Sequence, residues 1–426
     1  GSPSLALGVE WAAVAAPPPP LDEGVGNEPL GARRTRSGAL DLRGRDLLLI
    51  TVDALRADHV GAYGSTRGAT PEIDRLAREG TLFEAAYAAT PHTSYSLTSL
   101  MTGKYMRPLL LQGAGADSDL WPELLQTYGY RTAAFYPPAV FFIDGERFAA
   151  FRDRKFGFEY AKIEFAEGEK RVEQVRSYLK TAPREKRLFL WVHLFGPHEP
   201  YEEQAKSFGS RDIDRYDSEV HAADHTIGEL VKLVRERDAR SAVVISADHG
   251  EEFGDHGGRY HGTSVYDEQV RVPLVVSIPG VGAGGRRVSE PVQTIDLLPT
   301  VLSGLSVPIP PRIRGRDWGA LLAPPAEKPG TDKTAPSADD RGFAAAETEE
   351  YSLIAEAEWR LVCARRSGAC QLYDIRKDPG QQNDLSLQAP EVLRQRRQRE
   401  RSLAASHGEY ETQGLRAEGK GWPPAL

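Results

Sequence analysis

The sequence predicts an α/β protein with a mainly parallel central sheet flanked by helices, followed by a small C-terminal subdomain that contains an antiparallel sheet. Between residues 45 and 322, short runs of aliphatic and β-branched residues alternate with segments of helical spacing. Such alternation is typical of parallel strands that are buried on both faces. After residue 342 the strand-like runs follow one another without intervening helices, which favours an antiparallel sheet.

The individual elements follow from hydrophobic periodicity and from the turn residues that bound each run. The predicted strands of the parallel sheet are residues 47–52, 132–136, 188–195, 242–247 and 274–278. The predicted helices between them are residues 71–79, 94–102, 122–128, 216–237 and 295–302. Residues 343–373 predict the antiparallel sheet, and residues 390–406, rich in Arg, Gln and Glu, predict a solvated terminal helix.

Composition divides the chain into four parts and excludes some classes of partner. Residues 1–44, with four prolines at 17–20, predict an extended tether, 45–322 a catalytic domain, 323–341 a loop and 342–426 the C-terminal subdomain. The 426 residues are 40% hydrophobic and carry a net charge of −8, which is typical of a soluble globular protein and argues against nucleic-acid binding. No apolar run reaches the roughly 18 residues needed to span a bilayer.

Acidic residues follow two of the predicted strands at their carboxyl ends. Asp53 closes the run 47–52, and Asp248 and His249 close the run 242–247. Ligands of parallel sheets bind at the carboxyl ends of the strands, so these side chains can converge on a divalent cation. The alternative for either carboxylate alone is a turn or a helix cap.

A third element is the segment that begins at Thr93. Leu97, Leu100 and Met101 have helical spacing, and Gly103 suits the left-handed position after a helix end. Thr93 is therefore expected at or near the N-cap, where the helix dipole and a metal would favour its alkoxide. The alternative is that its hydroxyl only caps the helix.

With these segments in order, the chain resembles the sulfatase branch of the alkaline phosphatase superfamily from about Arg45 to about Ser386. The matching segments are residues 50–59, 70–77, 93–105, 189–193, 197–201, 216–220, 246–251, 270–274, 294–300 and 372–375. The resemblance implies the alkaline phosphatase fold and hydrolysis or transfer of an anionic ester, in a phosphorylated or sulfated small molecule, glycan or lipid headgroup.

One departure from the family pattern changes the expected chemistry. Sulfatases carry a cysteine that matures to formylglycine, with Pro and Arg two and four residues later, but this chain has Thr93, Tyr95 and Leu97. Related nucleotide pyrophosphatases and phosphoethanolamine or glycerophosphate transferases use threonine there to take up a phosphoryl group. We therefore expect a phosphoester hydrolase or transferase with a covalent intermediate on Thr93. The alternatives are a sulfuric ester hydrolase using Thr93, or a weakly active protein that binds anionic glycans or lipid headgroups.

Other departures bear on the number of metal ions. The family's frequent second acidic ligand is Ala54 here, and position 198 holds His where two-zinc relatives have Asp. The resemblance thus implies one divalent ion (Zn, Mn, Ca or Mg), held by Asp53, Thr93, Asp248 and His249.

Further site residues also come from the resemblance. His198 and His261 match positions where sulfatases place His or Lys against the ester oxygens, so both are expected to be catalytic. Lys104, His193 and His256 are expected to bind substrate. The alternative for Lys104 is a helix C-terminal cation, and for the histidines a structural hydrogen bond.

The two cysteines bear on localisation. Cys363 and Cys370 flank a predicted hairpin turn at 366–368, so a disulfide across two short strands is possible. If they are oxidised, the protein belongs in the periplasm or outside the cell; the alternative is two free thiols in the cytosol. Related transferases are often attached to membrane segments, so a membrane anchor upstream of this chain is compatible with the sequence.

Overall fold

The computed structural model describes residues 40–282, 284–322 and 342–417. Most of the expected tether at 1–44 and all of the expected loop at 323–341 lie outside these residues. Among the described helices, none is long and apolar enough to cross a membrane.

An eight-stranded sheet forms the centre of the larger part of the chain. Its strands, in spatial order, are β10 (Arg286–Val288), β2 (Thr81–Phe83), β9 (Leu274–Ser277), β7 (Ala242–Ala247), β1 (Leu47–Val52), β6 (Leu188–Leu194), β4 (Arg131–Tyr136) and β5 (Tyr160–Ile163). From β7 to β5 all neighbours are parallel, whereas β9 is antiparallel to both β7 and β2. The prediction of a mainly parallel sheet is therefore confirmed.

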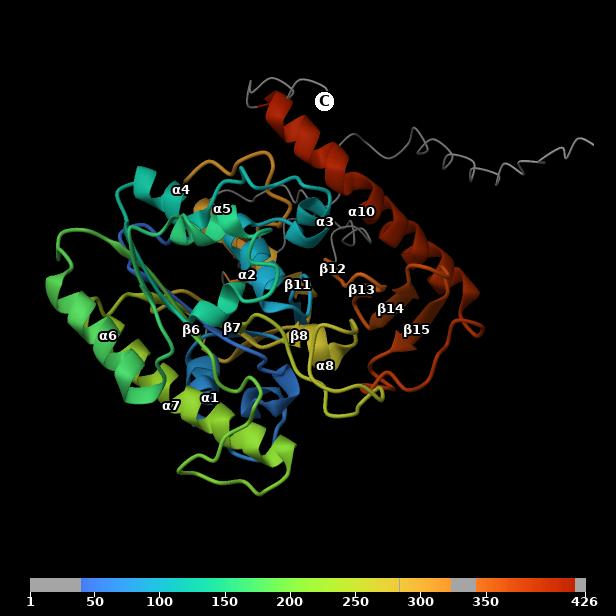
Figure 1. Cartoon of the computed structure of the whole chain (residues 1–426), viewed down its shortest axis with the longest axis horizontal. Helices are drawn as coiled ribbons and strands as arrows, with labels where there is room; N and C mark the ends of the chain where they lie inside the picture. Colours follow the sequence, from blue (N-terminus) through green and yellow to red (C-terminus); the bar gives the residue numbers. More distant parts are fainter. Residues whose placement is uncertain (1–39, 283, 323–341, 418–426) are drawn as a thin grey trace, which may run out of the picture.

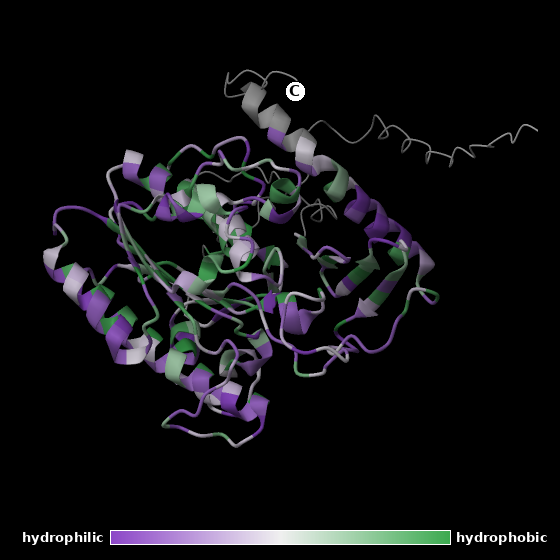
Figure 2. Ribbon diagram, in the orientation of Figure 1, coloured by the Kyte–Doolittle hydropathy of each residue, from purple (hydrophilic) through white to green (hydrophobic). Residues whose placement is uncertain are grey.

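Helices cover both faces of this sheet, as Figure 1 shows. One side carries α1 (Pro71–Glu79), α6 (Gly168–Thr181) and α7 (Asp212–Arg237); the other carries α2 (Thr93–Thr102), α3 (Met106–Leu111), α4 (Trp121–Thr127), α5 (Ala149–Arg152) and α9 (Leu297–Gly304). The outer sides of α6 and α7 are hydrophilic, and hydrophobic residues gather at the sheet (Figure 2). The outer helices α1, α6 and α7 each bury one apolar face, whereas α2 and α9 are buried on nearly all sides.

Short elements connect the layers. The one-turn helix α8 (Asp267–Val270) leads into β8 (Arg271–Val272), which pairs with β3 (Ala86–Tyr87) and, through it, with β11 (Val292–Gln293). The 3₁₀ segments are η1 (Ala57–His59), η2 (Gly61–Tyr63), η3 (Pro138–Phe141), η4 (Lys155–Gly157), η5 (Thr294–Asp296) and η6 (Gly319–Leu321).

The C-terminal part is an antiparallel sheet with one long helix on it. Its strands are β12 (Ala344–Glu347), β13 (Tyr351–Glu356), β14 (Trp359–Ala364) and β15 (Cys370–Asp374), and α10 (Pro390–Ala417) runs along them (Figure 1). Cys363 and Cys370 are cross-strand partners of β14 and β15 and form a disulfide. The alternative of two free thiols is therefore excluded.

The predicted elements differ from the observed ones mainly at helix ends and in short strands. The terminal helix is longer than the predicted 390–406, and η5 replaces the first turn of the helix predicted at 295–302. The helices α3, α5, α6 and α8 and the short strands β2, β3, β5, β8, β10 and β11 lie outside the predicted elements. β5 is half exposed on an edge, so its sequence lacks the continuous apolar run of a buried strand.

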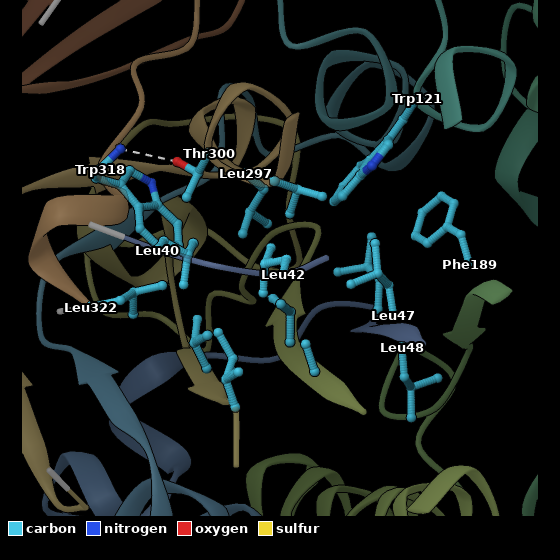
Figure 3. Close-up of a pocket in the computed structure, with 16 residues that line it drawn as sticks. Leu40, Leu42, Leu47, Leu48, Trp121, Phe189, Leu297, Thr300, Trp318 and Leu322 are labelled. Atoms are coloured by element: carbon cyan, nitrogen blue, oxygen red, sulfur yellow. Dashed lines mark hydrogen bonds between the residues drawn. The ribbon is translucent and has the colours of Figure 1, made fainter. Parts of the chain in front are cut away.

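A small apolar cavity of about 30 Å³ lies near the amino ends of the central strands (Figure 3). Leu47, Trp121, Leu297 and Trp318 are among its lining residues. Its walls are almost entirely apolar, so it is a packing gap in the core. Polar groups gather instead at the opposite, carboxyl ends of the strands.

Candidate metal and catalytic site

The register of the central strands brings two acidic residues together. Val52 at the end of β1 pairs with Ala247 at the end of β7 and with Leu194 at the end of β6. The next residues of β1 and β7, Asp53 and Asp248, are therefore neighbours at the same edge, and the Ala54 backbone N–H donates to Asp248 Oδ1 at 3.2 Å.

His193 in β6 joins the two carboxylates. One ligand atom from each of Asp53, His193 and Asp248 lies within 4.8 Å of the others, and all three side chains are buried. Asp53 Oδ1, Asp248 Oδ2 and His193 Nε2 have no hydrogen-bond partner among the described residues. Buried polar atoms left unpaired are costly, and two carboxylates with an imidazole are a donor set that fits a divalent cation.

The electrostatics of this cluster also favour a cation. Burial and the neighbouring charge of Asp53 raise the pKa of Asp248 to about 7. Burial would raise the pKa of Asp53 as well, but the neighbouring imidazole of His193, 3.6 Å from Asp53 Oδ2, together with those of His198 and His249, lowers it below its usual range. A cation between the two carboxylates would relieve their mutual repulsion.

His249 faces the cluster through one defined ring nitrogen. Its Nδ1 lies 2.9 Å from the Gly250 carbonyl oxygen, which can only accept, so Nδ1 carries the proton. Burial, and the charge of His261, lower the pKa of His249 well below its ordinary value, so the ring is neutral. The lone pair of Nε2 therefore points toward Thr93 Oγ1 at 3.0 Å and Asp53 Oδ1 at 3.5 Å.

Thr93 is the first residue of α2, and His92 occupies the N-cap position. The expectation of Thr93 at or near the N-cap is thus correct to within one residue. No side-chain capping hydrogen bond is made at this end of α2, and the Thr93 hydroxyl contacts His249 instead. Ser96 Oγ donates to the Asp248 carbonyl oxygen at 2.5 Å, so the first turn of α2 is fixed against the end of β7.

A second cluster borders the first on its exposed side. His198, Glu199 and His261 each offer a ligand atom within 4.8 Å of the others. His261 Nδ1 lies 3.0 Å from Glu251 Oε1, and the His261 ring stacks on that of His249 with centroids 4.2 Å apart. Burial alone would lower the pKa of His261, but the hydrogen bond and charge of Glu251 outweigh it and raise the pKa to about 9. His261 is thus a cation whose Nε2–H can donate.

The sequence predicts a substrate-binding role for His193, but the structure places its ring inside the buried cluster. Its side chain has 0% exposure, so the ring cannot contact a substrate in the solvent-facing cluster. His193 Nδ1 lies 2.9 Å from Thr51 Oγ1, which also accepts the indole N–H of Trp191 at 2.9 Å. Partners of this kind orient a metal-ligating imidazole, so the position of His193 fits a metal ligand as well.

Lys104 and His256, the other two residues predicted to bind substrate, make their polar contacts with protein groups. Lys104 follows the far end of α2, is buried, and donates to Glu411 at 2.9 Å and Ser118 at 3.0 Å. The helix that places Thr93 in the site therefore carries Lys104 to its opposite end. His256 uses both ring nitrogens in protein contacts, with Glu268 at 2.6 Å and the Gln381 carbonyl at 3.0 Å.

Three contributors were missed by sequence reasoning. Glu251 pairs with His261, Glu199 faces both His198 and His261, and Thr51 orients His193. Glu251 directly follows the Asp-His-Gly motif. Its place in the sequence could have indicated a role, because loop residues that follow the end of a strand lie at the edge of the site. Nothing in the sequence indicates the pairing partners of Glu199 and Thr51.

The sequence matches the sulfatase family model over residues 45–307 and the model for the C-terminal part of N-sulphoglucosamine sulphohydrolase over residues 254–405. It is 26% identical over 405 residues to an ulvan-active sulfatase of Formosa agariphila, covering 80% of this chain and 76% of that protein.

A second sequence relative and a solved structure are also similar to this chain. Identity to the delta 4,5-hexuronate-2-O-sulfatase of Bacteroides thetaiotaomicron is 24% over 414 residues, covering 80% of this chain and 84% of that one. The crystal structure of the phosphonate monoester hydrolase of Agrobacterium radiobacter superposes with a TM-score of 0.67 at 18% identity, covering 85% of this chain and 96% of that chain. The last likeness is one of fold.

Proposed function

We propose that this chain, which belongs to the sulfatase family, cleaves or transfers phosphoesters through a covalent intermediate on Thr93. One observation carries the proposal. The Thr93 hydroxyl lies 3.0 Å from the unprotonated Nε2 of His249, beside a buried cluster in which one atom each of Asp53, Asp248 and His193 lacks a partner among the described residues.

The cysteines of the chain favour phosphate over sulfate esters. Cys363 and Cys370 are its only cysteines, and both are in the disulfide of the C-terminal sheet. Formylglycine therefore cannot form, and the aldehyde hydrate that would eliminate sulfate is absent. A phosphothreonine needs no such elimination, because water or an alcohol can attack its phosphorus.

The buried cluster has the groups to hold one divalent ion. Asp53, Thr93, Asp248 and His249 would be its ligands, as predicted from the sequence, and His193 offers a further imidazole. When bound, such an ion supplies charge that lowers the pKa of a neighbouring hydroxyl and offsets the negative charge of the ester.

The protein's own groups then perform complementary steps. Thr93 Oγ1, at the positive end of the α2 dipole, loses its proton to solvent and forms a bond to phosphorus while the bond from phosphorus to the leaving oxygen breaks. His261 donates its Nε2 proton to that oxygen, and His198 beside it contacts the equatorial oxygens. Water or an alcohol next displaces Thr93, so the acceptor decides between hydrolysis and transfer.

A second candidate is cleavage of a sulfate ester in an anionic glycan. The observation that favours it is the names of two relatives, an ulvan-active sulfatase and a hexuronate-2-O-sulfatase. A third reading, binding of an anionic glycan or lipid headgroup without turnover, would not need a hydroxyl held beside a candidate metal cluster.

For each of these functions, the disulfide supports a periplasmic or extracellular location, because disulfides persist in oxidising compartments.

The test compares aryl phosphate diesters, aryl phosphate monoesters and aryl sulfates with the metal-loaded protein. We expect diesters to be cleaved faster than monoesters, because one cation offsets the single negative charge of a diester better than the higher charge of a monoester. Aryl sulfates should be cleaved slowest. Peptide mapping after a rapid acid quench should find a phosphoryl adduct on Thr93. The isosteric Thr93→Val should lose most turnover and Thr93→Ser keep part of it.

Two results would contradict the proposal. Faster turnover of sulfates than of phosphoesters would favour the second candidate. Unchanged turnover in Thr93→Val would exclude covalent catalysis at this residue. Thr127→Ala, a change of an exposed threonine at the end of α4, is the matched control and should behave as the unmodified protein.

A further inference from the structure

An exposed apolar surface borders the candidate site. Phe142 is 67% exposed, Ile143 61% and Phe165 48%, and Phe195 beside them is partly buried. We refer to these four residues as the apolar rim. Contiguous exposed apolar groups on a protein surface usually mark a binding site.

The sheet topology explains why the rim lies next to the site. Strands β6, β4 and β5 follow β1 in the sheet, in that order and all parallel to it, so their carboxyl ends meet the same edge as Asp53. Phe195 directly follows β6, Phe142 directly follows η3 after β4, and Phe165 follows β5 by two residues. The edge is thus polar over β7 and β1 and apolar over β4 and β5.

Ring contacts connect the rim to the site without a break. The centroids of Phe142 and Phe165 are 6.1 Å apart, and those of Phe165 and Phe195 are 5.4 Å apart. Phe195 stacks on His198 at 4.8 Å with an interplanar angle of 19°. His198 in turn contacts His261 at 4.9 Å, so a substrate held at His198 would extend over these rings.

The rim is also fixed relative to Thr93. Ser94, the residue after Thr93, donates from Oγ to the Val140 carbonyl oxygen at 2.6 Å. Val140 lies in η3, two residues before Phe142. The distance between the nucleophile and the rim is therefore set by a buried hydrogen bond.

We propose that the apolar rim binds an alkyl, acyl or aryl group of the substrate, so that the enzyme prefers amphiphilic esters to fully polar ones. This inference rests on the proposed function of the Thr93 site. It adds that the ester cleaved there carries an apolar substituent. An apolar substituent lying on the rim would cover Phe142, Ile143 and Phe165, and each methylene removed from water contributes up to about 0.8 kcal/mol.

The experiment uses p-nitrophenyl phosphodiesters whose second substituent grows from methyl to octyl, all at concentrations below micelle formation. We expect kcat/KM to rise by about two- to fourfold per methylene, as partial to full burial of each group implies, until the chain is longer than the rim. Phe142→Ser combined with Ile143→Ser should flatten this dependence.

The control combines Leu111→Ser with Tyr128→Ser, which removes exposed apolar side chains at the ends of α3 and α4. This variant should keep the chain-length dependence. A parallel series of alkyl sulfates separates the phosphoester preference from the role of the apolar rim. If turnover depends on chain length only with the sulfates, the phosphoester preference is overturned and the role of the rim is retained. Turnover of phosphodiesters without any dependence on chain length overturns the rim alone.

If neither series is turned over, thermal stabilisation by octylphosphonate compared with methylphosphonate tests the rim directly. Stronger stabilisation by the octyl compound, lost in the rim variant, supports the inference, and equal stabilisation overturns it. Binding of the unmodified protein to phosphatidylcholine vesicles with a flat chain-length series would also overturn it, because the rim would then dock a membrane. Self-association that the rim variant abolishes, again with a flat series, would overturn it in favour of a contact between copies.

Discussion

Thr93 Oγ1 lies 3.0 Å from His249 Nε2, although the two residues are 156 positions apart in the sequence. Two independent contacts hold this pair. Ser96 fixes the first turn of α2 to the Asp248 carbonyl, and the Gly250 carbonyl fixes the ring of His249 through Nδ1. The hydroxyl and the imidazole lone pair therefore face each other before any substrate binds, which is the preorganisation that catalysis requires.

Metal content should depend on the strand-end carboxylates. Asp248→Asn removes one of the two charges that face each other at the ends of β1 and β7, so we expect the purified variant to lose most of its bound divalent metal. Elemental analysis should give about one ion per chain for the unmodified protein under the single-metal prediction. Asp153→Asn, at an exposed carboxylate, should retain the metal. Equal metal content in both variants would contradict the ligand assignment.

Loss of His261 should reduce the rate of cleavage most for esters with poor leaving groups. The Glu251 carboxylate keeps His261 protonated, so its proton is available to a leaving alkoxide. We expect His261→Gln to slow alkyl phosphoesters by about 10²- to 10⁴-fold and p-nitrophenyl esters much less, because p-nitrophenolate leaves without a proton. Rates across a series of leaving groups measure this effect. A uniform loss would indicate charge stabilisation and not proton donation.

Lys104 should contribute to stability and not to substrate binding. Its ammonium is 1% exposed and paired with Glu411 of α10. Lys104→Met keeps the apolar stem but removes the charge, so we expect the free energy of unfolding to fall by about 1 to 3 kcal/mol. Urea unfolding measures the loss, and KM for a small diester should stay unchanged. A raised KM with unchanged stability would restore the substrate-binding role.

His256 should make stability depend on pH. Burial would lower its pKa, but the hydrogen bonds to Glu268 and to the Gln381 carbonyl raise it above the ordinary 6.5. The folded state therefore holds the proton more tightly than the unfolded state, so this stabilisation is complete below pH 6.5 and is lost as pH rises through the folded pKa. Urea unfolding at several pH values should show a smaller decline in His256→Gln. An identical decline would exclude His256 as its source.

The disulfide should stabilise the C-terminal sheet. It joins residues seven positions apart in the sequence, and closing so short a loop in the unfolded chain is worth about 2 to 3 kcal/mol. We expect the double change Cys363→Ser and Cys370→Ser to lower the unfolding free energy by that amount and to leave turnover at Thr93 intact. Denaturation with and without reductant provides the comparison, in which the double variant should be insensitive to reductant.

The sequence by itself determined the sheet, the strand-end acids and the position of Thr93. Long apolar runs such as 47–52 and 242–247 fix buried parallel strands, and the carboxyl ends of such strands meet at one edge. Asp53, Asp248 and His249 could therefore be grouped from local patterns alone. Gly103, with φ of 65°, ends α2 where the left-handed position was expected.

Only the tertiary structure decided which histidines and lysines serve the site. His193 and His198 lie on either side of the end of the same strand, yet one is fully buried beside Asp53 and the other faces Glu199. Lys104 is eleven positions after Thr93 in the sequence but at the opposite end of a rigid helix, where it meets Glu411. Local periodicity specifies the face and the end of an element on which a residue lies. The interaction partner of that residue depends on which distant segment packs against the face, and only long-range packing determines this segment.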